Sequence, residues 1–170
     1  MWEIDLEIAH SQSMILLLVK NTRYSFSTME GKDMTRDQFK ILHSEIMMFF
    51  QCIEFDLKRI YAGMSSEEFD DEMDMLETSS LGNTLAKLKK LDYSDGKPWL
   101  SESEYTQLDQ LRELRNYWCH QCYLDYIYID NKWAQENKFQ RISNRLYNEH
   151  NRVLNLHRKL ENLYFKWFED

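Results

Sequence analysis

Three residues whose side chains suit phosphate chemistry lie close together in the second half of the chain: Arg115, Asn116 and His120. A guanidinium binds phosphate oxygens, and an imidazole exchanges protons near neutral pH. RNA cleavage requires both abilities, because the ribose 2′-hydroxyl loses a proton as it attacks phosphorus and the 5′-oxygen gains one, while negative charge develops on the phosphorane. These residue types predict RNA cleavage without a metal ion or cofactor, with His120 as general acid or base, Arg115 on the phosphate and Asn116 orienting either group.

The spacing of the arginine and the histidine is weak evidence by itself. Two further pairs, Arg145/His150 and Arg152/His157, have the same four intervening residues. In a chain with this many Arg and His residues, about one chance match across such spacings is expected. The surroundings of each pair must therefore distinguish them, and the two C-terminal histidines are expected beside a hydrophobic seam, where packing alone explains them.

The helix that would position the first pair has a clear start. The sequence Ser101-Glu102-Ser103-Glu104 carries an N-cap and first-turn acids, and no helix breaker follows before about Asp130. At 3.6 residues per turn, one face of this helix is polar and the opposite face apolar, with Arg115 at the flank of the polar stripe. The stripe consists of Arg112, Asn116, His120 and Tyr123, and the apolar face of Leu111, Leu114, Trp118 and Cys122.

The rest of the chain predicts further helices around this one. Thr35 and Gln38 form a capping box, and apolar residues then recur at three-to-four spacing as far as Gly63. A short acidic helix capped by Ser65 or Ser66 is expected over 67–77, another helix over 81–91, and a loop over 92–100. Residues 1–19 fit a strand or, with Ile4, Ile8, Ile15 and Val19 on one stripe, a helix, which we favour; residues 20–34 suit a polar loop.

The last helix, expected over about 132–168, has a heptad seam. Phe139, Leu146, Val153, Leu160 and Trp167 lie seven residues apart, and only Glu149 interrupts the apolar pattern. Basic residues follow the same period, and such a stripe could bind an RNA backbone, although ordinary flanking positions of a heptad helix explain it as well. The RNA-binding candidates are Arg112, Arg141, Arg145 and Arg152, beside Lys138, Lys159 and Lys166.

The composition of the chain limits the fold class, the kind of nucleic-acid binding and the location that can be expected. The chain has 170 residues with one Pro and four Gly, and 43% of its residues are hydrophobic, which predicts a single all-α domain over 1–170, a compact bundle of about five to six helices with a long C-terminal helix. A net charge of -8 argues against coating nucleic acid by charge alone. Three cysteines and no long apolar run predict reduced thiols, no membrane anchor and a cytoplasmic location. Cys119 and Cys122 are spaced like a metal or redox pair, but a buried thiol is the better interpretation of Cys122.

The segment from Leu111 to His120, LRELRNYWCH, resembles the motif helix of HEPN-domain proteins. The signature of that helix is an Arg, often followed by Asn, with a His four to six residues after the Arg. Arg115, Asn116 and His120 match it position by position. Two upstream segments, 50–58 and 80–88, look like the core helix and the Leu-Gly segment of some members, so that the resemblance spans about 39–128.

The resemblance implies a helical bundle that forms a homodimer, in which two motif helices face each other and build one composite ribonuclease site. Members act as toxins or phage-defence effectors, often with an antitoxin partner. Some carry a Tyr two residues after the His that the antitoxin modifies, whereas this chain has Cys122 there and Tyr123 one place later. Glu54 and Tyr123 are candidate supporting residues, and a structural hydrogen bond is at least as good an interpretation of Glu54.

Two other classes of function remain open from the sequence. A non-catalytic helical module would bind a nucleotide or a partner protein through the same polar stripe, because Arg and His bind phosphates without cleaving them. A coiled-coil scaffold would instead associate through the C-terminal heptads.

Overall fold

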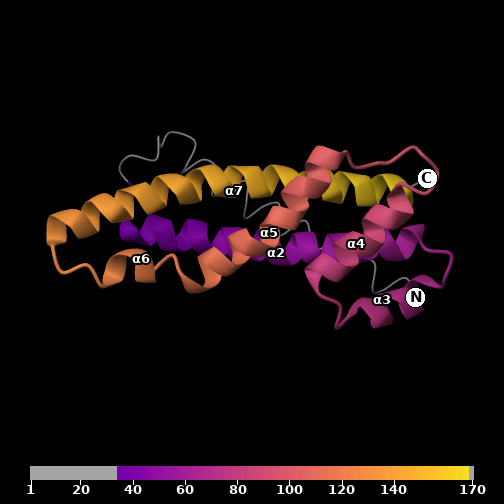
Figure 1. The fold of residues 1–170 in the computed structure, drawn as a ribbon, viewed down its shortest axis with the longest axis horizontal. Helices are drawn as coiled ribbons and strands as arrows, with labels where there is room; N and C mark the ends of the chain where they lie inside the picture. The colour runs from indigo at the N-terminus through magenta and orange to yellow at the C-terminus, as the bar shows by residue number, and fades with distance from the viewer. Residues whose placement is uncertain (1–33, 169–170) are drawn as a thin grey trace.

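The computed structural model describes residues 34–168, with side chains to residue 165. Within this range the chain forms helices and no strand, which confirms the all-α prediction and the long C-terminal helix (Figure 1). The N-terminal segment, for which a helix is favoured, lies outside the described residues. The helices are α2 (Arg36–Met64), α3 (Phe69–Leu76), α4 (Leu81–Asp92), α5 (Glu102–His120), α6 (Leu124–Ile127) and α7 (Lys132–Phe168).

The two longest helices, α2 and α7, lie side by side and run in the same direction (Figure 1). Their pairing begins with Arg36, which forms an ion pair with Glu136 at 3.1 Å, and reaches Arg59, whose guanidinium lies 3.4 Å from the ring centroid of Tyr164. The heptad seam of α7 faces α2, and the four described members of the seam are buried: Phe139, Leu146, Val153 and Leu160. Burial of this continuous apolar stripe is the main stabilisation of the pair.

The shorter helices pack on one side of the α2–α7 pair. Helix α5 crosses both long helices in Figure 1, α4 packs against α2 and α5, and α6 packs against the first half of α7. One apolar core joins these elements, and Trp118 of α5 is one of its largest fully buried side chains. No described helix is both long and apolar enough to cross a membrane.

The predicted helix starts are confirmed at three places. Thr35 and Gln38 form the expected capping box, Ser101 and Glu104 form a second, and the Ser80 side chain caps α4 by accepting from the Asn83 amide. The prediction for α3 is wrong at its start. That helix begins at Phe69 after Glu68, which makes no side-chain capping bond, because the Ser65 hydroxyl instead accepts from the Glu67 amide before the helix starts.

The predicted end of α5 is also wrong. The sequence has no breaker before about Asp130, yet α5 ends at His120 and three turn residues separate it from α6. The amides of Gln121 and Cys122 both donate to the carbonyl of Tyr117. The helix ends there because the tertiary structure offers other partners for its last carbonyl groups and buries the Cys122 side chain. His120 is therefore the last residue of α5, and Tyr123 is not part of its polar stripe.

Candidate functional site

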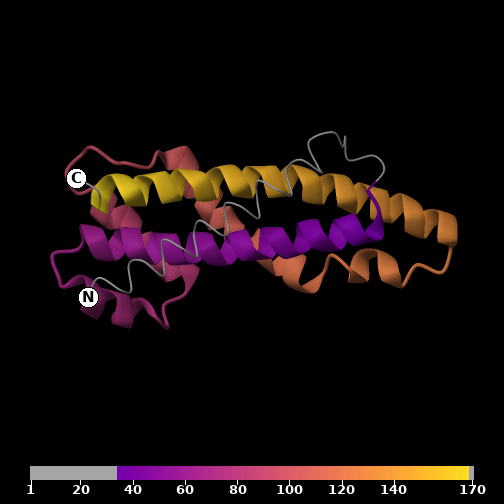
Figure 2. The same cartoon turned by 180° about the vertical axis from the view of Figure 1, so that it is seen from behind.

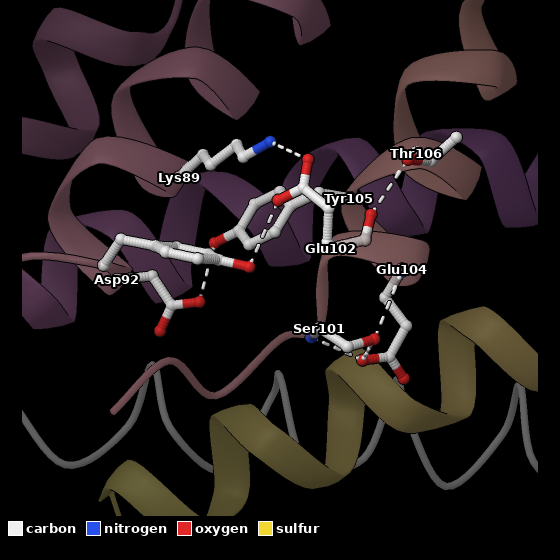
Figure 3. A network of polar contacts seen from close by, with 8 residues as sticks. Lys89, Asp92, Ser101, Glu102, Glu104, Tyr105 and Thr106 are labelled. Atoms are coloured by element: carbon white, nitrogen blue, oxygen red, sulfur yellow. Dashed lines mark hydrogen bonds and ion pairs between the residues drawn. The ribbon is translucent and has the colours of Figure 1, made fainter. Parts of the chain in front are cut away.

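The start of α5 is fixed by polar contacts that tie it to α4 and to the preceding loop (Figure 3). The Asp92 carboxylate, at the end of α4, accepts from the amides of Trp99 and Leu100 at 2.8 and 3.2 Å and from the Tyr105 hydroxyl at 2.9 Å. Burial and the Asp92 carboxylate raise the pKa of Tyr105. Two carboxylate oxygens thus satisfy three donors of the loop and of α5, which fixes where α5 begins.

Charged contacts hold the same turn of α5 from two sides. Lys89 of α4 forms an ion pair with Glu102 at 2.6 Å (Figure 3). The Tyr93 hydroxyl donates to the other oxygen of that carboxylate at 3.3 Å. Glu104, besides closing the capping box, forms an ion pair with Lys159 of α7. These contacts set the direction in which α5 crosses the long helices.

Trp118 anchors the other half of α5 to α7. Its indole N–H donates to the Glu149 carboxylate at 2.6 Å, and the second oxygen of that carboxylate accepts from Arg145 at 2.8 Å. The Arg145 guanidinium also lies 3.8 Å from the ring centroid of Tyr117. Glu149, the residue that interrupts the heptad seam, is therefore the partner of a buried indole, and Arg145 is held by its neighbours rather than projecting free into solvent.

His43 of α2 forms a hydrogen bond with the end of α5. Its Nε2–H donates to the carbonyl of Trp118 at 2.9 Å, and the Cys122 thiol donates to the same carbonyl at 3.1 Å. The Tyr123 ring packs edge-on against the rings of His43 and Phe39, with centroids 5.2 and 5.7 Å apart. Tyr123 thus lies among packed aromatic rings, and not beside His120 on the outer face of α5.

Arg115, the first residue of the motif, binds α2. Its Nη1 donates to Glu54 Oε2 at 2.7 Å, and the two side chains are 35% and 24% exposed. Glu54 is the acidic residue that the sequence suggested as a supporting group, so the structure brings these two candidates together. A guanidinium has five N–H donors. Because this contact uses one of them, Arg115 keeps donors for a phosphate.

Asn116 and His120 lie on the solvent face of α5, with Arg112 one turn before them. All three side chains are exposed, and each is four residues from the next, so they form one row along the helix. Arg115 and His120 are five residues apart, which turns the two side chains about 140° away from each other around the helix axis. One copy of the chain therefore presents the histidine and the asparagine together, and the arginine at the flank.

Some members of the basic series of α7 have a carboxylate partner. Arg145 and Lys159 make the contacts described above, and Lys138 lies 3.9 Å from the carboxylate of Asp125. Arg141 and Arg152 are exposed. The series is thus not a continuous row of free cations, and its held members contribute to the packing of α5 and α6 on α7.

The histidines of the two competing pairs are buried between α2 and α7. His150 Nε2 lies 3.1 Å from Glu45, and His157 Nδ1 lies 3.2 Å from Asp56. Both rings pack against Phe49, with centroids 5.5 Å apart. Their packing role beside the heptad seam is confirmed, and His120 is the only exposed histidine of the three pairs.

The thiols show no arrangement that resembles a metal site. Cys119 is exposed with its sulfur 3.9 Å from that of Met47, whereas Cys122 is buried, which confirms the buried-thiol interpretation. Burial raises the pKa of Cys122 to about 11. Among residues 34–165, no three His, Cys, Asp or Glu side chains gather in a way that could hold a metal ion.

Comparison with known proteins gives no relative of this chain: no family model, no curated protein and no solved structure matches it. The resemblance to HEPN proteins therefore depends on the motif and the two upstream segments of the sequence alone.

Sequence reasoning missed the residues that hold the motif end of α5 in place. His43 appears in the sequence only as a polar interruption of an apolar stripe, four residues after Phe39. Glu149 gave a better signal, since a single carboxylate in a heptad seam needs a buried donor. Nothing in the local sequence says that the donor is Trp118.

Proposed function

We propose that this protein is a metal-independent endoribonuclease of the HEPN type, with a site that two copies of the chain build together. The observation that carries the proposal is the placement of the motif: Asn116 and His120 share the exposed face of α5, and Arg115 lies at its partly exposed flank. Because Arg115 and His120 diverge on one helix, a second α5 facing the first would bring the arginine of each copy toward the histidine of the other.

In this mechanism His120 removes the proton of the ribose 2′-hydroxyl or protonates the leaving 5′-oxygen, and its counterpart in the second copy performs the complementary transfer. Arg115 binds the scissile phosphate and stabilises the charge of the phosphorane, with Glu54 fixing the direction of the guanidinium. Asn116 orients the phosphate or the imidazole. The products are a 2′,3′-cyclic phosphate and a 5′-hydroxyl. A role as a toxin or phage-defence effector, with an antitoxin as partner, belongs to the same proposal.

The test is cleavage of a mixed RNA in EDTA by the parent chain and by His120→Ala and Arg115→Ala. Loss of general acid–base catalysis is expected to lower the rate about 10²- to 10⁴-fold. Gln121→Ala changes an exposed residue next to His120 and serves as the matched control. Sedimentation equilibrium reports whether each variant keeps the oligomeric state of the parent. Equal cleavage by the parent and both variants would exclude this mechanism.

A second candidate is a non-catalytic module that binds a nucleotide or a phosphorylated partner through the same face. The observation that favours it is the ion pair of Arg115 with Glu54, because a guanidinium held in one direction binds a phosphate through its remaining N–H donors whether or not the phosphate is cleaved. This candidate predicts that the parent chain leaves RNA intact while a nucleotide raises its melting temperature. The Arg115→Ala variant would then lose that shift.

A further inference from the structure

A groove lies between α4 and α5, so that the helix carrying the motif forms one of its walls. The groove is open to solvent and has a volume of about 690 Å³, which is space enough for a group the size of a nucleotide. Both helices lie behind the α2–α7 pair in Figure 2, and Figure 3 shows the part of the groove near Lys89 and Tyr105. The groove is therefore a candidate ligand site on the same side of the long helices as the motif.

The middle of the groove is apolar and uncrowded. Leu85 of α4 and Tyr105 of α5 both line it and are buried, so they form its floor. Gly82 and Ala86, one turn apart on α4, also line it and have little or no side chain to fill the space above that floor. A flat ring packs well on an apolar surface that includes an aromatic side chain. The shape of the groove thus suits a planar group.

The charges along the groove are unevenly neutralised. Near the start of α5, Lys89 and Glu102 form the ion pair already described. Asp109, two turns further along α5, lines the groove and is exposed, and no described residue forms a hydrogen bond or an ion pair with it. The pKa of Lys89 is raised chiefly by its bond to Glu102 and also by the charge of Asp109, which places this carboxylate within reach of the groove. Asp109 is therefore an acceptor that lacks a donor.

Arg112 lies at the other end of the groove. Its Nη1 is 4.0 Å from the position that a Cβ on Gly82 would take, so the guanidinium lies over the first turn of α4. Arg112 has no hydrogen-bond or ion-pair partner among the residues that the structure describes. It follows Asp109 by three residues and begins the exposed row that continues through Asn116 to His120. An acceptor and then a phosphate-binding group thus lead from the groove toward the motif.

We propose that the groove binds one base of the RNA substrate, that this base carries an amino group, and that the Asp109 carboxylate accepts from it. The choice of RNA as the ligand rests on the proposed function. Cytosine, adenine and guanine each present an exocyclic amino group, whereas uracil presents carbonyl oxygens that a carboxylate repels. The base ring lies on Leu85 and Tyr105, and Arg112 binds the phosphate that joins this nucleotide to the next.

The first test compares the binding of two labelled 2′-O-methyl RNA hexamers, all cytosine and all uracil, by fluorescence anisotropy. These hexamers cannot be cleaved, because the 2′-hydroxyl is blocked, and they have the same phosphates. The parent chain is expected to bind the cytosine hexamer at least about fivefold more tightly, and Asp109→Ala is expected to bring the ratio of affinities close to one. Asp130→Ala removes the same charge from an exposed residue outside the groove and should keep the parent ratio. Equal binding of both hexamers by the parent, or an unchanged ratio in Asp109→Ala, would overturn the proposal.

The second test fills the groove with Ala86→Leu. This variant is expected to lose the preference for cytosine, whereas Gln110→Leu, which places the same side chain on an exposed residue of α5 that does not line the groove, should keep it. Sedimentation equilibrium reports the oligomeric state of both variants. A changed oligomeric state of Ala86→Leu with an unchanged preference would overturn the proposal, because the groove would then be an interface between copies.

The two proposals fail in different ways. A parent chain that prefers cytosine through Asp109 but leaves RNA intact would contradict the ribonuclease and support the base site. A parent chain that cleaves RNA but binds both hexamers equally would support the ribonuclease and refute the base site.

Discussion

The end of α5 and the middle of α7 carry the same Arg-to-His spacing in opposite environments. On α7, His150 and His157 are buried and face the carboxylates of Glu45 and Asp56. On α5, His120 is exposed at the last residue of the helix. A buried histidine with a carboxylate partner contributes to the packing of two helices, whereas an exposed histidine contributes little to stability and is accessible to a substrate.

The arginines of these pairs differ in a similar way. Arg145 is held between the Glu149 carboxylate and the Tyr117 ring, so its guanidinium serves the packing of α5 on α7. Arg115 has a single carboxylate partner, Glu54, so that other N–H donors of its guanidinium stay available to a ligand, although its side chain is 35% exposed against 43% for Arg145. The spacing therefore carries no functional information, and the burial of the histidine and the partners of the arginine separate a packing pair from a candidate site.

The largest effect on stability is expected from His157→Ala. This change leaves the Asp56 carboxylate buried without its imidazole partner, and breaking a buried pair costs about 3 kcal/mol or more. His120→Ala removes an exposed side chain and is expected to change the free energy of unfolding by less than about 0.5 kcal/mol. Urea unfolding of both variants measures the difference. Similar losses in the two variants would mean that the contrast between the two helices is wrong.

A smaller loss is expected from Trp118→Phe, which keeps most of the buried ring but removes the N–H that donates to Glu149. An unsatisfied buried acceptor costs about 1–3 kcal/mol, and a loss toward the lower end of this range is expected because Glu149 is partly exposed and keeps its bond to Arg145. Trp133→Phe is the matched control, because Trp133 is 78% exposed and has no such role. The thermal midpoint of each variant gives the measurement. A midpoint for Trp118→Phe as high as that for Trp133→Phe would show that the Glu149 bond does not anchor α5.

Alkaline pH should loosen the end of α5 through Cys122. The pKa of its thiol is about 11 in the folded protein and near 9 in the unfolded chain, so the unfolded state loses the proton first and stability falls as pH rises from 9 to 11. The slope is at most about 1.4 kcal/mol per pH unit. Unfolding curves of the parent and of Cys122→Ala at several pH values test this expectation, and parallel declines in the two proteins would contradict it.

A small change in stability is expected from Glu54→Gln. The pair with Arg115 is partly exposed, and such pairs contribute less than about 1 kcal/mol. The kcat of RNA cleavage should fall while KM stays nearly unchanged, because the guanidinium loses the group that orients it while its charge still binds RNA. Lys40→Gln, which breaks an exposed pair with Asp37 on α2, serves as the control. A large loss of stability in Glu54→Gln would make Glu54 a structural residue instead.

The sequence by itself determined most of the helices and where several of them start. Capping boxes at Thr35 and Ser101 and the heptad seam of α7 are local signals, because a cap involves residues three apart and a helical stripe repeats every turn. The exposure of Asn116 and His120 also followed from their place on the polar face of α5. These properties depend on neighbours in the sequence, which is why the sequence alone predicts them.

Only the tertiary structure decided the end of α5 and the partners of its side chains. The helix ends at His120 because His43, 75 residues from Trp118, binds the carbonyl of that residue, and because Cys122 is buried beneath it. The partner of Arg115 is likewise 61 residues away, on α2. Contacts between distant segments depend on how the helices cross, and no local pattern specifies that crossing. The three Arg-to-His pairs, equal in the sequence, therefore become different only when α2, α5 and α7 pack together.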